Sequence, residues 1–358
     1  TSMDPVRLLL ISTTAVLSLM LLIEWNQYSD EYQKQQSELY AAVITEPGLV
    51  TNEQVAAPMS QGINDGIPSV NPEMNPLSVL LDDSETFNLS TDTLNLVVSA
   101  DGGDVVSASL PKFPVRLDTP DQPFRLLENN NLRRYVAQSG LIGPDGIDAS
   151  GNRARYTSQG VTNNGDGSHT LTLAWTGNDP LGMQVHKLFT AHDDRYDVDV
   201  SFDIRNGGSS VASVTSFAQL KRDNTQAPDG NTGFGVSPYL GAALTQPDKR
   251  YTKLSFSDLN DEPFSKRLPA GWVAILQHYF VSAWIPSHQA THDYFASQLS
   301  NGDNVIGYKN QNIDIAPGAA TTVTQTLYVG PKDQVALAAL AENLDLVIDY
   351  GWLWWLAQ

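Results

Sequence analysis

The chain has 358 residues, of which 41% are apolar and 17% charged, with a formal net charge of −19 and no cysteine. This length is sufficient to bury a sizeable core, and the acidic balance argues against general nucleic-acid binding and against a soluble part that lies flat on an anionic membrane. The lack of cysteine excludes disulfides, thiolate catalysis, zinc–thiolate sites and iron–sulfur clusters.

The first predicted element is a membrane-spanning helix near the start of the chain. Residues 8–23 read LLLISTTAVLSLMLLI without a charge. These residues rise about 24 Å as a helix, and extension to Trp25 brings the span close to the ~30 Å hydrocarbon core. Arg7 would snorkel at one end, and Trp25 would lie at the other interface. We therefore predict an anchor over residues 3–27 that includes Leu8, Leu17 and Leu22.

Charges beside this span predict its orientation. Arg7 precedes the apolar run, whereas Glu24 and Asp30 follow it. The positive end stays in the cytoplasm, so the rest of the chain is expected to be exported. Cleavage of a signal peptide would need small residues after the run, where Glu24 and bulky residues stand, so we expect an uncleaved anchor. Residues 1–2, ahead of Met3, are interpreted as a cloning remnant.

Residues 28–84 are predicted to form a flexible acidic linker. Prolines recur from Pro47 to Pro76 with Gly, Asn and Ser between them, and the acidic residues far outnumber the one base, Lys34. Such a segment buries too little apolar surface to offset the entropy of ordering it. We expect an extended tether that holds the following domain away from the membrane.

Residues 85–345 are dense in strand patterns and are predicted to form one large β domain. The clearest strand is 196–205, in which buried-type and polar residues alternate. Further strands are predicted at 94–98, 105–110, 169–175, 183–190, 211–221, 272–284, 305–308 and 321–329. About a dozen strands separated by Gly-rich turns predict an antiparallel two-layered sandwich larger than an immunoglobulin domain. Helices that alternate with strands are missing, which disfavours a nucleotide-binding α/β fold.

One helix is predicted late in the β domain, over residues 331–344. Leu337, Leu340 and Leu344 share one face at helical spacing. Asp333 would lie in the first turn, where the helix dipole favours an anion.

Two polar patterns resemble metal sites but are better explained otherwise. Asp197, Asp199 and Asp203 alternate along a strand, whereas a calcium loop needs irregular backbone, so we interpret them as a solvated face. His288 and His292 have the spacing of a helical zinc pair but lack the Glu of H-E-x-x-H, so we expect a loop with two surface imidazoles. No metal or cofactor is predicted.

An enzymatic alternative is a carbohydrate-binding or sugar-epimerising domain on the membrane anchor. Such a site needs a carboxylate base and an imidazole acid that face one sugar. His278, within the predicted strand 272–284, would have to face Glu128 or Glu262. The sequence has no Walker loop, no complete G-x-G-x-x-G and no G-x-S-x-G elbow, so no catalytic residue is otherwise expected.

The last residues, 346–358, are rich in tryptophan. Trp352, Trp354 and Trp355 crowd four positions beside Leu353 and Leu356. Such a cluster would be an exposed apolar patch unless lipid or more protein covered it, and tryptophan prefers the membrane interface. We expect the start of a segment that returns to the bilayer and is cut short at the end of this chain.

Several blocks of residues, in order along nearly the whole chain, resemble one family. After the apolar anchor and the acidic tether, they are GGDV (102–105), LLE (126–128), QSGL (138–141), FAQLK (217–221), GWVAILQHYFVSAWIP (271–286), LYVGP (327–331) and LDLVIDYGWLW (344–354). Together they resemble the first membrane helix and periplasmic domain of YidC-type membrane protein insertases.

The resemblance implies a β-supersandwich similar to galactose mutarotase, closed by a C-terminal helix. It implies a non-catalytic, accessory role in the insertion and folding of inner-membrane proteins, alone or beside the Sec translocon, with contact to a SecF-type component. In the family, nascent membrane proteins meet a later five-helix membrane core whose groove bears an arginine. That core and its arginine have no counterpart here. A purely structural spacer is a further alternative.

The resemblance also points to candidate residues. The domain is expected to connect to the membrane core through the late helix and the stretch after it: Leu337, Leu340, Leu344, Asp349, Tyr350, Gly351, Trp352, Trp354 and Trp355. The simpler reading is that Leu337 and Leu340 only close the sandwich. The Gly- and Pro-rich loop 223–237 is a candidate partner surface because such loops are exposed and adaptable; its residues include Asp223, Pro228, Gly233 and Phe234.

Overall fold

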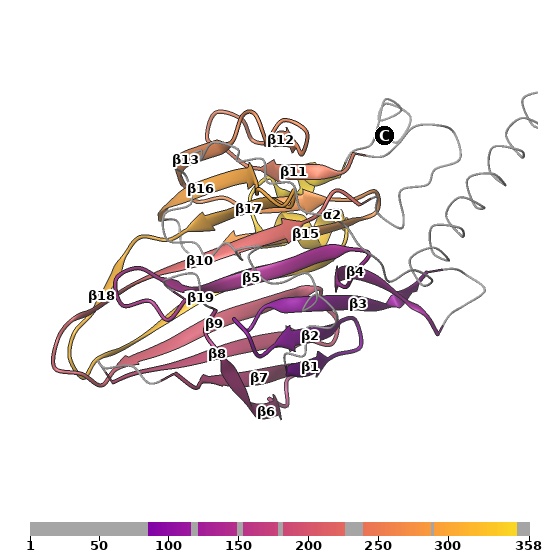
Figure 1. Cartoon of the computed structure of the whole chain (residues 1–358). Coiled ribbons are helices and arrows are strands. Elements are labelled where there is room, and N and C mark those ends of the chain that lie inside the picture. The colour runs from indigo at the N-terminus through magenta and orange to yellow at the C-terminus, as the bar shows by residue number, and fades with distance from the viewer. Residues whose placement is uncertain are drawn as a thin grey trace, which may run out of the picture. The chain divides into compact units, whose positions relative to one another are not determined.

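The computed structural model describes residues 85–115, 121–148, 153–177, 182–225, 239–287 and 290–348. Within these ranges the protein forms two large sheets, in which every strand pairing is antiparallel (Figure 1). The predicted mainly β, two-layered antiparallel fold is therefore confirmed. The described part holds 19 strands, more than the dozen expected.

The first sheet begins at β1 and ends at β13. Its strand order is β1 (Thr86–Ser90), β2 (Asn95–Ser99), β3 (Val105–Pro114), β4 (Pro123–Asn129), β5 (Arg134–Ile142), β10 (Ala212–Arg222), β17 (Asn304–Lys309), β16 (Thr291–Gln298) and β13 (Phe264–Pro269), with β18 (Ile313–Ile315) also paired to β10.

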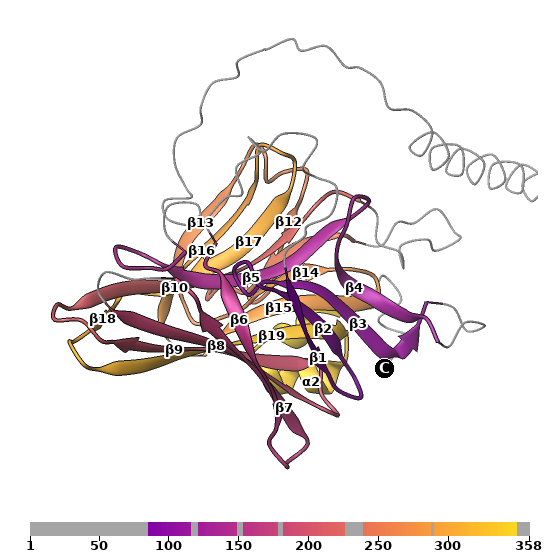
Figure 2. The same cartoon turned by 60° about the horizontal axis from the view of Figure 1, so that its bottom comes forward.

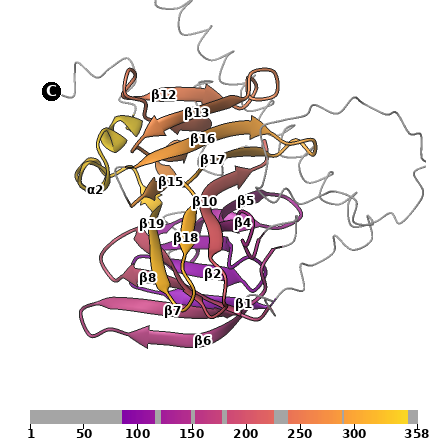
Figure 3. The ribbon, with the colours of Figure 1, turned by 90° about the vertical axis from the view of Figure 1, so that its left-hand side faces the viewer.

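The second sheet begins at β12 and ends at β6. Its order is β12 (Thr252–Ser255), β11 (Gly241–Leu244), β14 (Val273–Leu276), β15 (Phe280–Pro286), β19 (Ala320–Pro331), β9 (Asp197–Asn206), β8 (Met183–His192), β7 (Ser168–Trp175) and β6 (Tyr156–Asn163). In two views, β12 and β13 lie at one end of the domain and β6 and β7 at the other (Figures 1 and 3).

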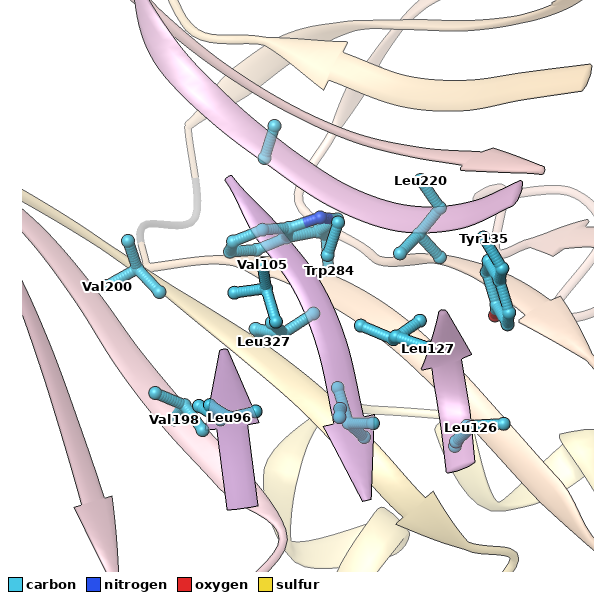
Figure 4. Packing of buried hydrophobic residues seen from close by; sticks show 14 of the residues in the cluster. Leu96, Val105, Leu126, Leu127, Tyr135, Val198, Val200, Leu220, Trp284 and Leu327 are labelled. Atoms are coloured by element: carbon cyan, nitrogen blue, oxygen red, sulfur yellow. The ribbon is translucent and has the colours of Figure 1, made fainter. Parts of the chain in front are cut away.

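Figure 2 shows the strands of both sheets from a second side, and the main core fills the space between their inner faces (Figure 4). Val198 and Val200 of β9 and Leu327 of β19 meet Leu96 of β2 and Leu220 of β10 there, and all five are at most 1% exposed. The alternation predicted for β9 holds, because its apolar positions are all buried and most of its polar positions are not. Val198 and Val200 lie in the main core, and Phe202 and Ile204 lie in another apolar cluster. Burial of this apolar surface is the main force that joins the sheets.

Most strands absent from the prediction lack a visible two-residue period. In β5 every residue after Arg134 is buried, and β11 is buried throughout, so neither alternates. By contrast, seven of the eight residues of β6 are exposed. Period-2 patterning marks only strands with one dry and one wet face.

The single strand predicted over 272–284 is wrong. The chain forms two strands there, β14 and β15, which pair with each other as a hairpin. The backbone N–H of Gln277 donates to the carbonyl of Phe280 at 3.0 Å and closes the turn, in which Tyr279 is 60% exposed. Because both strands are buried on both faces, the sequence reads as one apolar run that hides the turn at His278.

The late helix exists but is shorter than predicted. Helix α2 spans Gln334–Leu340, and a 3-10 turn, η2, spans Leu344–Val347. Between them Ala341 is extended and Asn343 is left-handed, with a φ of 64°, so the helix cannot continue to Leu344. Asp333 is the N-cap, and its Oδ1 accepts from the N–H of Ala336 at 2.9 Å.

Candidate functional site

The first candidate site is the outer face of the second sheet, where the end of the β domain packs. Leu337 of α2 and Leu344 and Val347 of η2 are 0% exposed. Together with the partly buried Leu340, they form a second apolar cluster with outward-facing side chains of β14 and β15, including Ala274 and Val281. Leu337 and Leu344 therefore close the sandwich on its outer side.

A hydrogen bond joins the residue before β14 to the segment that follows α2. Trp272, just before β14, is 0% exposed, and its Nε1 donates to the carbonyl of Glu342 at 3.1 Å. Trp272 belongs to the same apolar cluster as Leu337. The block 271–286 thus meets the described part of the block 344–354, residues 344–348, at this cluster.

A pocket of about 430 Å³ lies beside the end of α2. It is lined by Thr245, Gln246, Pro247 and Arg250 of the β11–β12 turn, by the turn before β14 and the end of β15, and by Leu340–Asn343. Ala270 (φ 32°) and Asn343 (φ 64°) both line it, and in the described part of the chain they are the two non-glycine residues with positive φ. Backbone strain of this kind persists where surrounding structure imposes it.

The second candidate site is a buried polar network between the sheets. The Arg153 guanidinium pairs with Asp104 and, through Nη1 at 2.9 Å, with Asp148. Gln138 Nε2 donates to Asp104 at 2.7 Å. Lys187 of β8 is 0% exposed, and its Nζ donates at 2.9 Å to the carbonyls of Gly102 and Ser139.

Motif glycines leave room for this network. Gly102 has a φ of +75°, and a Cβ there would meet the Arg153 guanidinium at 2.3 Å. A Cβ on Gly103 would meet Lys187 at 2.9 Å, and one on Gly140 would meet Asp148 at 2.4 Å. The blocks 102–105 and 138–141 therefore form a structural joint between the sheets. Sequence reasoning noted both blocks but missed their role, because Arg153 and Lys187 lie outside them.

Burial lowers the pKa of the basic side chains in this network, and the nearby carboxylates raise it. Burial alone would lower the pKa of Arg153, but Asp104 and Asp148 raise it, so the guanidinium stays charged. Burial lowers the pKa of Lys187 to about 7, since no carboxylate contacts its Nζ directly. The unfolded chain would hold this proton until its pKa of 10.5.

We expect the free energy of unfolding to rise with pH between about pH 7 and pH 10.5, with a slope of up to about 1.4 kcal/mol per unit from Lys187. In that window the unfolded chain binds more protons at Lys187 than the folded chain does, so a higher pH favours folding. Urea titrations at several pH values would measure the slope, and a Lys187→Met variant should lack this part of it. If the free energy of unfolding of the variant rose with pH as steeply as that of the unsubstituted chain, Lys187 would keep its proton in the folded chain across this pH range.

The enzymatic candidates are not brought together as a site. His278 lies in the β14–β15 turn, where its ring is 3.9 Å from that of Tyr279. Glu128 lies in β4 at 3.7 Å from Arg125 and lines a pocket that contains neither of the other two residues. Glu262 lies in the exposed loop before β13. The pocket beside Glu128 therefore holds a carboxylate without the imidazole that the reaction needs.

The expectation of a surface imidazole at His292 is wrong. His292 lies in β16, is 3% exposed, and has ring contacts with Tyr294 and Tyr308. His292 and Tyr294 are buried at alternate positions of β16, with the half-buried Asp293 between them. The strand is absent from the prediction because four consecutive buried residues, 294–297, interrupt its alternation. His288 lies outside the described residues. In the described ranges, no three His, Cys, Asp or Glu side chains gather as metal ligands would.

The aspartates of β9 serve as hydrogen-bond acceptors along the outer face of the second sheet. Thr326 Oγ1 donates to Asp199 at 2.9 Å, and Thr322 Oγ1 donates to Asp203 at 2.6 Å. Asp197 pairs with Arg195 and is 5% exposed. The solvated-face reading thus holds for Asp199 and Asp203 but is wrong for Asp197, which is buried.

Several predicted residues lie outside the described ranges. They are the anchor residues Arg7, Leu8, Leu17, Leu22 and Trp25, the loop residues Pro228, Gly233 and Phe234, and the segment from Asp349 to Trp355. Asp223 of the loop is described, and its side chain accepts from the backbone N–H of Thr225 at 3.1 Å. Among the described residues, no helix has the length and apolar character needed to cross a membrane.

Comparison with known proteins gives a family match over most of the chain. The family described as YidC periplasmic domain matches residues 86–358. A curated protein of Marinomonas sp. (strain MWYL1), named membrane protein insertase YidC, is 37% identical over 342 residues, which cover 95% of this chain and 61% of that protein. One of Pseudomonas syringae pv. syringae (strain B728a), with the same name, is 37% identical over 366 residues, covering 99% and 64%. The chain thus spans less than two thirds of the length of these relatives.

Solved structures with a similar arrangement of strands are distant in sequence. A galactose mutarotase related enzyme from Lactobacillus acidophilus has a TM-score of 0.47 and 11% identity, and the match covers 68% of this chain and 97% of that one. A galactose mutarotase-like protein from Lactobacillus casei has a TM-score of 0.46 and 8% identity, with 68% and 100% covered.

Proposed function

This chain belongs to the family of the YidC periplasmic domain, and from that membership we propose that it is the anchor and periplasmic domain of a membrane protein insertase. The β domain has an accessory, non-catalytic role in the insertion and folding of inner-membrane proteins, with or beside the Sec translocon. A SecF-type component is its translocon partner, and nascent membrane proteins are the substrates of the whole insertase.

The family match is the observation that carries this proposal. The sequence supports the placement in the inner membrane: residues 8–23 form the single N-terminal span, residues 28–84 form the tether, and the positive end stays inside. Packing of Leu337 and Leu344 on the second sheet supports the role of the late helix as the rigid exit from the β domain. The stretch from Asp349 to Trp355 then connects that exit to the membrane.

Single cysteines offer a test of the topology, because the chain has none of its own. Thr162→Cys in the exposed β6 should react with a membrane-impermeant maleimide once the outer membrane is opened, whereas Ser2→Cys should react only after the inner membrane is lysed. The reverse pattern would place the β domain in the cytoplasm and would contradict the proposal.

Photo-crosslinking would test the proposed partners. A benzophenone amino acid at exposed positions, such as Tyr279 in the β14–β15 turn and Thr225 at the start of the loop, would be activated in membranes that contain the full-length insertase. Adducts with Sec translocon components or nascent membrane proteins are expected. If no position on the β domain gave such an adduct, the domain would be a spacer rather than a working part of the insertase.

A further inference from the structure

Positive charge gathers at one corner of the β domain, although the chain as a whole is acidic. Five of its 21 basic residues lie on or beside the two edge strands β12 and β13. Arg267 pairs with Asp293, and we call the other four the basic corner: Lys249, Arg250, Lys253 and Lys266. All four are exposed. Figures 1 and 3 show both edge strands at the same end of the domain, opposite the β6–β7 hairpin.

Gln246 ties the two edges of the corner together. The Nζ of Lys266 donates to Gln246 Oε1 at 3.1 Å, and Gln246 Nε2 donates to Thr252 Oγ1 at 2.9 Å. The backbone of Gln246 also exchanges hydrogen bonds of 2.9 and 3.2 Å with that of Lys249. Through Gln246, hydrogen bonds therefore connect Lys249 of the β11–β12 turn to Lys266 of β13.

The basic corner carries more positive than negative charge. Lys249 and Arg250 form no ion pair with another residue of the described part. Lys253 Nζ lies over the Tyr239 ring at 4.7 Å, which leaves its charge in place. Three acids lie near the corner. Asp248 precedes Lys249 in the chain, Glu342 lines the pocket, and Asp258 is near enough to Tyr239 to add to burial in raising the pKa of that phenol. Asp261 and Glu262 lie further along the loop between β12 and β13.

The basic corner borders the pocket at the end of α2. Gln246 and Arg250 form one wall of this 430 Å³ pocket, and Leu340 and Asn343 form another. Asn343 is nine residues before Trp352 in the sequence, and nine residues span at most about 30 Å. If residues 349–355 lead to the bilayer, as proposed above, the corner lies within reach of lipid headgroups.

We propose that the basic corner and the pocket beside it form a contact surface for anionic phospholipid headgroups on the periplasmic side of the inner membrane. This proposal rests on the proposed function, which places the β domain beside that bilayer. Arg250 and the three lysines attract the phosphates, and the pocket accommodates one headgroup between Arg250 and the end of α2. An acidic protein can thus approach an anionic surface with this one corner, while its remaining charge keeps the other faces away.

Energy transfer between single labels and lipid can test this surface in the full chain. Ser287→Cys, exposed beside the pocket, and Thr162→Cys in β6 at the other end would each carry a donor dye. The chain would be reconstituted in phosphatidylcholine vesicles, with and without about one third phosphatidylglycerol, which contain headgroup-labelled acceptor lipid. We expect phosphatidylglycerol to raise transfer from Ser287→Cys by about twofold or more and to leave Thr162→Cys unchanged.

Charge reversal provides the variant and its control. The test variant combines Lys249→Glu, Arg250→Glu and Lys266→Glu. In phosphatidylglycerol vesicles, energy transfer from Ser287→Cys in this variant should fall to the value measured in phosphatidylcholine alone. The corresponding Gln substitutions should give an intermediate value. The matched control is Lys112→Glu, Arg125→Glu and Arg205→Glu, which changes the net charge equally at exposed bases outside the corner. About 0.5 M salt should remove the phosphatidylglycerol effect.

Three outcomes would overturn the proposal. Energy transfer from Ser287→Cys could be equal in both kinds of vesicle, or it could be equal with and without the charge reversal. The phosphatidylglycerol effect could also be lost in inorganic phosphate at matched ionic strength. The last result would indicate a site for free phosphate instead of a bilayer surface.

Flotation with phosphatidylcholine vesicles tests the proposed anchor separately. A chain that did not float would contradict the anchor, and the charge-reversed variant would then be compared for binding to added phosphatidylglycerol vesicles.

Discussion

Replacing Arg153 with alanine is expected to lower the free energy of unfolding by about 3–5 kcal/mol. The Arg153 guanidinium is the cation that pairs with Asp104 and Asp148, whose side chains are 8% and 0% exposed. Without it, two carboxylates would remain between the sheets with Lys187 alone to balance them. Urea denaturation followed by tryptophan fluorescence would measure the loss.

Arg155 offers a matched control two residues away. It also pairs with an aspartate, Asp101, at 2.9 Å, but the two side chains are 56% and 44% exposed. Water screens such a pair, so Arg155→Ala should cost at most about 0.5–1 kcal/mol. If the loss of stability arises from an unpaired buried carboxylate, Arg153→Ala should lower the free energy of unfolding by less in the Asp148→Asn variant than in the unsubstituted chain. Equal losses in the two arginine variants would contradict the assigned role of the network.

Replacing Leu337 with alanine should cost about 2–5 kcal/mol, because it removes a 0%-exposed side chain from the cluster under α2 and leaves a cavity. Backbone amides of α2 and η2 should then exchange hydrogen faster than those of the main core, since these elements are held by that cluster. Thermal unfolding and hydrogen exchange would measure both effects.

Val335 is the control on the same helix. It is 81% exposed, and alanine is a better helix former, so Val335→Ala should leave stability unchanged or slightly raised. If Leu337→Ala were as stable as Val335→Ala, α2 would contribute nothing to closure of the sandwich, and its role as a rigid exit from the domain would be lost as well.

The sequence predicts strands well where one face is wet and the other dry. The alternation in β9, with Val198 and Phe202 inside and Asp199 and Asp203 outside, is visible in the residues themselves. Strand β5 has no such contrast, because its neighbours cover both faces. The β14–β15 hairpin is hidden for the same reason. What covers each face is a property of the fold, and no local pattern reports it.

The candidate sites divide in a similar manner. The apolar face of α2 could be predicted, since Leu337 and Leu340 stand three residues apart on one side. Leu344 joins the same cluster from η2, after a break in the helix that the spacing does not reveal. The network around Arg153 could not be predicted, because Asp104, Arg153 and Lys187 are far apart in sequence and no spacing rule relates them. The basic corner is similar: β12 and β13 end two different sheets, and only the fold brings Lys249 and Lys266 to one turn.

The strand β6 ends the second sheet with eight residues that carry no charge. An uncharged open edge invites another molecule to extend the sheet. The register shift between Ser158 and Gly160, where Gly160 has a φ of 100°, interrupts the ladder near the middle of this strand. A neighbouring copy could match its backbone to only one half of β6 at a time. The irregularity therefore protects crowded copies of the domain from assembling edge to edge into fibres.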